Sequence, residues 1–252
     1  MESVNSQNCI IRVKNLTKKF NKVTAVNDID FCVKSGEVFA FLGPNGAGKT
    51  TAIKMLTTLL RPTSGTIRVN GFDPVKEQAK ARSSFGIVFQ DQSIDEELTA
   101  KENMQFHAVL YRVPKKQRAK SIEEMIKFVG LWKRRNHLVR DFSGGMKRRL
   151  EIARGLLHTP EILFLDEPTL GLDPQTRAQI WQKIMSLNKE RNMTVFLTTH
   201  YIEEADKMAD KVAVIDNGKI IKTGSVPQIK KETGTDSLED AFLKLTGKKI
   251  RD

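Results

Sequence analysis

The 252-residue sequence predicts an α/β fold with a mainly parallel sheet, an antiparallel β piece at the N-terminal end and an inserted helical subdomain. Short apolar runs typical of buried strands alternate with segments in which apolar residues have helical spacing. This alternation stops from about residue 93 to 158, where helical periodicity continues with little that resembles a strand. We therefore expect one domain over 1–225 that contains this insertion, and a short helical extension over 226–252.

The first strands are half-buried. Apolar residues alternate at Ile11 and Val13, and again at Ile29, Phe31 and Val33. Every second side chain of a strand points to the same face, so each strand is expected to bury one face. These strands form the antiparallel piece.

The later strands are expected to be buried on both faces. The run at 38–42 is entirely apolar, as is typical of a central strand of a parallel sheet. A hairpin is expected where 212–215 is followed by the turn 216–218 and a returning strand at 219–222. The remaining predicted strands lie at 66–69, 86–89, 162–165 and 194–197.

The chain is basic. Lys plus Arg number 42 against 30 Asp plus Glu, which gives a formal net charge of +12. This surface attracts polyanions in general, so the charge alone does not identify a partner. The densest clusters, 133–135 and 147–149, are not interleaved with aromatic residues. We interpret both as solvated faces and expect no nucleic-acid partner.

Cysteine content and hydropathy indicate a compartment. The two cysteines, Cys9 and Cys32, fit a reducing compartment. No stretch approaches the roughly 18 consecutive apolar residues of a membrane span. The segment 1–8 lacks the basic-then-apolar pattern of a secretory signal. We therefore expect a protein that is neither exported nor embedded in a membrane.

A glycine-rich loop follows the apolar strand at 38–42. Its residues fit the pattern G-x-x-x-x-G-K-[ST]: Gly43, Pro44, Asn45, Gly46, Ala47, Gly48, Lys49 and Thr50. Such a loop aims several backbone N–H groups at a phosphate, while Lys49 adds a charge and the Thr50 hydroxyl can bind Mg²⁺. A helix beginning at Thr51 would favour the phosphates by its dipole. The strand and helix on either side disfavour a glycine turn without a ligand.

Two further elements carry polar groups suited to this chemistry. Asp166 and Glu167 follow the buried strand at 162–165, at the end of a parallel strand where ligands bind. There Asp166 can hold the shell of Mg²⁺ and Glu167 can polarise a water. Ser143, Gly144 and Gly145 open an amphipathic helix, so the serine can cap it and the glycines leave its first N–H groups accessible to an anion.

The ordered set of loop, S-G-G signature and Asp-Glu strand end resembles the ATP-binding cassette (ABC) ATPases over about residues 10–224. The resemblance implies roles for four further residues. Phe20 would stack on adenine, Gln90 would contact Mg²⁺ from the Q-loop, Asp173 would lie in the D-loop of a dimer, and His200 would be the switch histidine. Lys49, Glu167 and His200 would be catalytic.

The resemblance also implies a dimer, in which Ser143, Gly144 and Gly145 contact the nucleotide of a second copy or of a related cassette. The signature departs from the common family pattern, with Phe142 and Met146 in place of Leu and Gln, and Phe20 replaces the commoner Tyr. None of these changes removes an anion contact.

Segments 142–149, 169–174 and 237–243 resemble ATPase subunits of ABC-2-type exporters, the drug-resistance group related to daunorubicin efflux. The resemblance implies an ATPase that uses ATP and Mg²⁺. It would act at the cytoplasmic face of the cell membrane through a separate membrane-spanning permease. The alternative is a soluble ABC ATPase in cofactor assembly. A regulatory module without turnover is disfavoured because Lys49, Glu167 and His200 are all retained.

Overall fold

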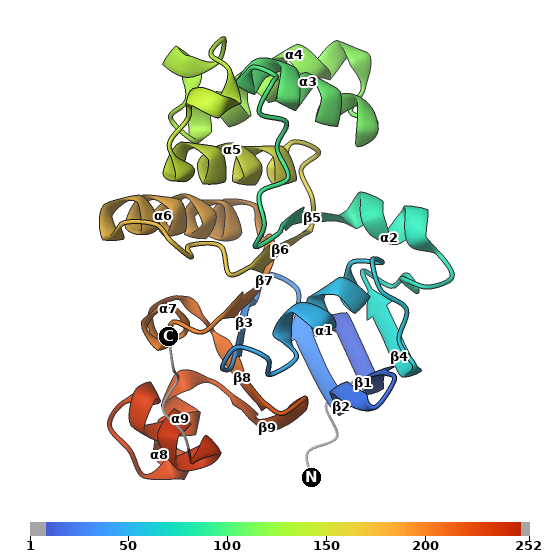
Figure 1. Ribbon diagram of the computed structural model, residues 1–252, viewed down its shortest axis with the longest axis vertical. Coiled ribbons are helices and arrows are strands. Elements are labelled where there is room, and N and C mark those ends of the chain that lie inside the picture. The colour runs from blue at the N-terminus through green and yellow to red at the C-terminus, as the bar shows by residue number, and fades with distance from the viewer. Residues whose placement is uncertain (1–8, 248–252) are drawn as a thin grey trace.

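The computed structural model describes residues 9–247, which form two sheets surrounded by helices (Figure 1). Segments 1–8 and 248–252, the expected ends of the domain and of the C-terminal extension, lie outside the described residues. The larger sheet has, in spatial order, the strands β5 (Phe85–Val88), β6 (Ile162–Asp166), β7 (Thr194–Thr199), β3 (Val38–Leu42), β8 (Lys211–Asp216) and β9 (Lys219–Gly224). All neighbours are parallel except β8 and β9, which form a hairpin. The predicted mainly parallel sheet is confirmed.

The smaller sheet is antiparallel and lies beside helix α1, at the lower right of Figure 1. Its strands are, in spatial order, β2 (Val23–Lys34), β1 (Cys9–Phe20) and β4 (Ser64–Val69). This sheet confirms the predicted antiparallel piece at the N-terminal end.

A disulfide joins Cys9 to Cys32 across β1 and β2. The antiparallel pairing of these strands brings the two Cα atoms to 5.5 Å, a separation that a disulfide can span. The cysteine content alone did not predict this bond. Periodicity identifies the residues of each strand, but it does not say which strands pair or in what register.

Helices fill the connections between strands. They are α1 (Lys49–Leu56), α2 (Gln78–Ser84), α3 (Ala100–Leu110), α4 (Lys115–Phe128), α5 (Gly144–Leu156), α6 (Pro174–Arg191), α7 (Ile202–Met208), α8 (Val226–Thr233) and α9 (Leu238–Thr246), with short 3₁₀ turns at Trp132–Arg134 and Val139–Asp141. Helices α3, α4 and α5 gather at the top of Figure 1, and α8 and α9 pack together at the lower left. Within residues 9–247, no helix is both long enough and apolar enough to span a bilayer.

Strand β3 lies at the centre of the larger sheet and separates two apolar cores. Val38, Ala40 and Leu42 point to the face that is covered by α5 and α6. Phe39 and Phe41 point to the other face, toward α1 and the antiparallel sheet. Because alternate side chains of a strand point in opposite directions, an all-apolar strand is buried on both faces. Burial on both faces fixes the point where β3 ends and the glycine-rich loop begins.

Candidate nucleotide site

A cleft of about 720 Å³ lies where β3, β6 and β7 end. Its lining comprises Ala25, Asn45, Gly46, Gly48, Lys49, Thr50, Thr51, Gln90, Glu167, Leu170, His200 and Tyr201. In open α/β sheets, ligands bind outside the carboxyl ends of the strands. The fold therefore brings the glycine-rich loop, Glu167, Gln90 and His200 to one place.

The glycine-rich loop turns directly from β3 into α1. Gly48 precedes the helix with φ 104°, in the left-handed region. A Cβ atom at this position would lie 2.4 Å from the Ala25 carbonyl oxygen, so both the conformation and the space require glycine. The turn between β8 and β9 also holds the loop, because the Gly218 N–H donates to the Ala47 carbonyl at 3.0 Å.

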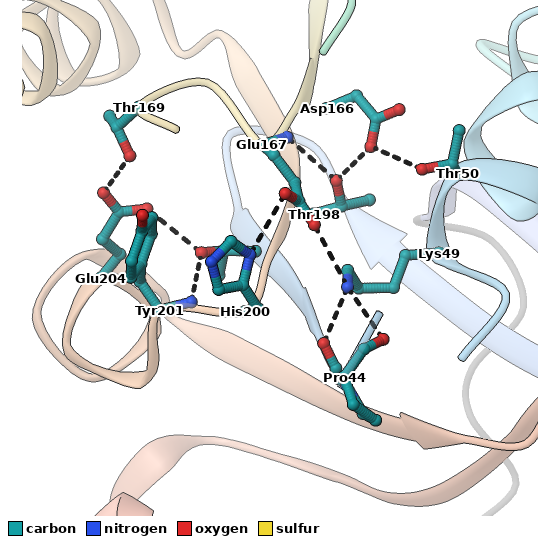
Figure 2. A network of polar contacts seen from close by, with 12 residues as sticks. Pro44, Lys49, Thr50, Asp166, Glu167, Thr169, Thr198, His200, Tyr201 and Glu204 are labelled. Carbon is teal, nitrogen blue, oxygen red and sulfur yellow. Dashed lines mark hydrogen bonds and ion pairs between the residues drawn. The ribbon is translucent and has the colours of Figure 1, made fainter. Parts of the chain in front are cut away.

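The Lys49 ammonium is surrounded by oxygen atoms (Figure 2). Its Nζ lies 2.8 Å from the Gly43 carbonyl, 3.1 Å from the Pro44 carbonyl and 3.3 Å from Glu167 Oε1. Burial lowers the pKa of Lys49, while the charge of Glu167 opposes that shift. A cation at the mouth of the loop suits a site that receives phosphate groups.

Glu167 lies between Lys49 and His200. Its Oε2 is 3.1 Å from His200 Nδ1, and both side chains are buried. The Glu167 backbone has φ 46°, a left-handed conformation that is uncommon outside glycine. Its N–H donates to both the carbonyl and the hydroxyl of Thr198, each at 3.1 Å. The backbone of Glu167 is therefore held by Thr198 in a conformation of unfavourable free energy.

Asp166 lines a recess that adjoins the cleft at Thr50 and Gln90. It accepts hydrogen bonds from the hydroxyls of Thr198 and Thr50, the latter at 3.3 Å. Burial raises the pKa of Asp166, and the two hydroxyl donors oppose the shift. Gln90 lines the same recess of about 180 Å³ together with Thr50 and Asp166. The predicted Mg²⁺ residues are therefore neighbours.

The oxygen groups of Thr50, Asp166 and Gln90 suit a Mg²⁺ ion that is bound partly by the protein and partly by the substrate. Within residues 9–247, no group of three or more His, Cys, Asp or Glu side chains could hold a metal ion alone. Mg²⁺ is usually bound by one or two carboxylates and takes its remaining ligands from substrate phosphates and water. The hydroxyl of Thr50, the carboxylate of Asp166 and the amide of Gln90 fit that mode.

The other predicted site residues lie outside the cleft lining. Phe20 ends β1 with 45% of its surface exposed, and its ring lies 4.9 Å from Lys18 Nζ. Ser143, Gly144 and Gly145 lie at the start of α5. Asp173 caps α6 by accepting from the Thr176 N–H at 2.9 Å. One chain therefore does not bring the S-G-G segment to its own glycine-rich loop.

One predicted surface residue is buried. The sequence predicts a solvated face at 147–149, but Arg148 is buried and its guanidinium lies beside the backbone of Glu167. The amphipathic spacing of α5 indicates this burial, because residue 148 stands four positions before the buried Ile152 on the same helix face.

Two other residues of the site were also missed. Thr198 contacts both Asp166 and Glu167, as described above. Its signal was its position at the carboxyl end of β7, beside the end of β6. Glu204 is buried and accepts hydrogen bonds from Thr169, Trp181 and Thr199, which precedes His200. No local sequence pattern distinguishes Glu204 from an exposed glutamate at a helix start.

Known proteins resemble this chain along most of its length. Residues 26–170 match the family described as ABC transporter. The daunorubicin resistance ATP-binding protein DrrA3 of Streptomyces coeruleorubidus is 40% identical over 237 residues, which cover 94% of this chain and 74% of the relative. The linearmycin resistance ATP-binding protein LnrL of Bacillus subtilis is 41% identical, covering 91% of this chain and 73% of the relative.

Solved structures agree with the sequence relatives. An ATP-binding subunit of an ABC transporter superposes with a TM-score of 0.86 at 28% identity, covering 94% of this chain and 99% of that one. The dimeric post-hydrolysis state of the cassette MJ0796, bound to ADP and phosphate, gives a TM-score of 0.78 at 29% identity, covering 85% of this chain and 98% of that one. With the family match extending over more than half of the sequence, the chain belongs to the ABC transporter family of ATP-binding proteins.

Proposed function

We propose that this chain hydrolyses ATP to power an exporter whose membrane-spanning pathway belongs to a separate polypeptide. One observation supports this most directly: Lys49, Glu167 and His200 form a buried, contiguous cluster at the mouth of the glycine-rich loop. The relatives named above are resistance proteins, which favours export. They do not favour the alternative of a soluble ATPase in cofactor assembly.

Glu167 acts as the general base in this proposal. It takes a proton from water as the water oxygen bonds to the γ-phosphorus, and the bond from that phosphorus to the β–γ bridging oxygen breaks to release ADP. Lys49 stabilises the charge on the outer phosphates, and His200 orients the Glu167 carboxylate from its other side. The backbone N–H groups of residues 43–51 hold the phosphates, and Phe20 stacks on adenine.

Thr50, Gln90 and Asp166 would hold Mg²⁺, with Asp166 acting through a water. Bound there, the ion supplies neutralisation of the charge on the β- and γ-phosphates. The hydrogen bond between Thr50 and Asp166 already holds two of these oxygen groups next to each other.

The active unit in this proposal is a dimer of two copies or of related cassettes. The S-G-G segment at 143–145 lies outside the cleft of its own chain, so it is available to the nucleotide of a partner. Asp173 lies at the N-cap of α6, and the resemblance assigns it to the D-loop of the dimer. One of the solved neighbours is described as dimeric, which supports this arrangement.

The permease would dock on residues 90–111, the segment that leads into helix α3 and the helix itself, which lies at the top of Figure 1. Helix α3 exposes Phe106, Val109 and Leu110, each more than half accessible. Exposed apolar clusters of this kind mark interaction sites. The chain would then work as a peripheral protein at the cytoplasmic face of the cell membrane.

Two measurements test the proposal. Glu167→Gln should retain ATP binding and lose nearly all steady-state hydrolysis, because the amide keeps the shape of the side chain but cannot accept the proton. Hydrolysis at the parent rate would remove Glu167 as the base. The second measurement is copurification from detergent-solubilised membranes, which should recover a polytopic membrane protein. Recovery of a soluble assembly partner instead would favour the alternative function.

A further inference from the structure

Arg148 of helix α5 uses every N–H of its guanidinium in hydrogen bonds. The five acceptors are the carbonyls of Phe89, Asp166, Glu167 and Pro168 and the carboxylate of Glu151. Arginine carries five such donors in a rigid planar fork, so this side chain is fully satisfied without water. Glu151 is completely buried and lies 3.0 Å from Nη1, and it compensates the charge.

Three of these acceptors are consecutive carbonyls of the segment that carries the proposed base. Nη2 lies 3.1 Å from the carbonyls of both Asp166 and Glu167, and Nε lies 2.6 Å from that of Pro168. The Glu167 backbone is in the left-handed region, where a residue with a Cβ stays only if its surroundings hold it. Thr198 holds its N–H side and Arg148 holds its carbonyl side.

The same helix holds both ends of the Q-loop. Arg148 donates to the Phe89 carbonyl just before Gln90. After Gln92, the Ser93 N–H donates to Glu151 at 2.8 Å, and Arg154 donates to the Ser93 carbonyl at 2.6 Å. Three buried charged residues of α5, Arg148, Glu151 and Arg154, thus connect this helix to the Q-loop, and Arg148 also connects it to the end of β6. Because α5 begins with the S-G-G segment, we call it the signature helix.

We propose that Arg148 is a positioning residue for hydrolysis, which sets the direction of the Glu167 carboxylate by holding the carbonyls of residues 166–168. This inference rests on the proposed role of Glu167 as base. It adds that the signature helix of a chain fixes the base of that same chain. A movement of α5 would therefore move the Glu167 backbone through the Arg148 side chain.

The test is Arg148→Lys in the full-length chain. Lysine keeps the charge beside Glu151, but it offers three donors from one point and cannot reach all the carbonyls. We expect kcat for Mg·ATP to fall by about tenfold or more, since small displacements of a catalytic group have large effects on rate. The Kd of a fluorescent ATP analogue should change by less than about twofold, because Lys49 and the glycine-rich loop are untouched.

A double variant separates positioning from general damage. In the Glu167→Gln background, single-turnover hydrolysis should be nearly the same with Arg148 or with lysine, because the side chain acts through a base that is already lost. Arg118→Lys is the matched control. Arg118 also binds a backbone carbonyl, that of Val113 at 2.7 Å, but it lies in α4 away from the site. It should keep the parent kcat.

Three results would overturn the inference while leaving the function intact. The first is that Arg148→Lys keeps the parent kcat, and the second is that it loses nucleotide affinity as much as kcat. The third is that adding Arg148→Lys to Glu167→Gln lowers the single-turnover rate by the same factor as in the parent. If Glu167→Gln itself hydrolyses ATP at the parent rate, the assignment of the base fails first. A variant that unfolds is recognised by its thermal midpoint, and the double variant Arg148→Gln with Glu151→Gln then repeats the test without leaving an unpaired buried charge.

Discussion

The hydroxyl of Ser143 accepts a hydrogen bond from the Met146 N–H at 3.3 Å and thereby caps helix α5. The next residue, Gly144, is exposed, and a Cβ atom built there has no neighbour within 4 Å. A Cβ on Gly145 would instead lie 2.9 Å from the Thr176 side chain. Gly144 is therefore the position at which a charge can be added to the signature without a clash.

Gly144→Asp should block the ATP-dependent dimer and leave the ATP affinity of the monomer nearly intact. The added carboxylate would face the γ-phosphate of a partner and repel it. The measurement is sedimentation of Glu167→Gln protein with Mg·ATP, with and without the added charge. Gly144→Ala, which adds bulk but no charge, should still dimerise. Dimers with aspartate, or a monomeric enzyme whose specific activity ignores concentration, would contradict the two-fold arrangement.

Charge reversal near the start of α3 should uncouple transport while sparing the ATPase of the isolated subunit. Glu97 and Lys101 are exposed, so reversing them leaves the core intact. Glu102 is excluded because it completes the capping box with Thr99, and its loss would weaken the helix. Transport and basal ATPase are measured side by side, with Glu124→Lys on α4 as control. Equal loss of both activities would argue against docking here.

Reduction should destabilise the chain. The bond between Cys9 and Cys32 closes a loop with a sequence separation of 23. Closing a loop of this size contributes about 3 kcal/mol in the chain-entropy description. For a chain of this size that corresponds to roughly 6–12 °C in the thermal midpoint. Dithiothreitol should lower the midpoint of the parent but not that of Cys32→Ser. Identical midpoints for the oxidised and reduced parent would show that the bond adds nothing.

Lowering the pH should reduce the free energy of unfolding through His107, a residue of α3 that interacts with Arg154 of α5. Burial, aided by the Arg154 charge, lowers the pKa of His107 to about 4. Protons then bind the unfolded chain more readily, so stability is lost as the pH falls from near 6.5 toward about 4. Burial also lowers the pKa of His158, which stacks on Tyr111. The midpoint of His107→Gln should fall less than that of the parent between pH 7.5 and 5. An equal fall would exclude His107 as a contributor.

The sequence was sufficient for the features that local patterns specify. The all-apolar run at 38–42 predicted a central strand because burial on both faces leaves no polar position. Glycine-rich phosphate loops are similarly local, since neighbouring residues provide the whole cradle. The contacts of Arg148 are different. They join residues up to 59 positions apart, and no period of the sequence specifies which carbonyls will meet a buried guanidinium.

The charge of a residue was also a poor guide to its environment. Arg148 and Glu204 resemble surface residues in the sequence, yet each is buried with partners from several elements. The left-handed backbone of Glu167 likewise depends on Thr198 and Arg148, which are distant in the chain.

The central place of β3 determines which parts of the molecule open last. Its five residues are fully buried and are bonded on one side to β7 and on the other to β8. Amide hydrogens in such a strand exchange with solvent only when most of the protein unfolds. The glycine-rich loop begins at the next residue, so one end of the loop is anchored in the slowest-exchanging region. The first residue of the loop is therefore already ordered before nucleotide binds, and binding does not have to supply the free energy to order it.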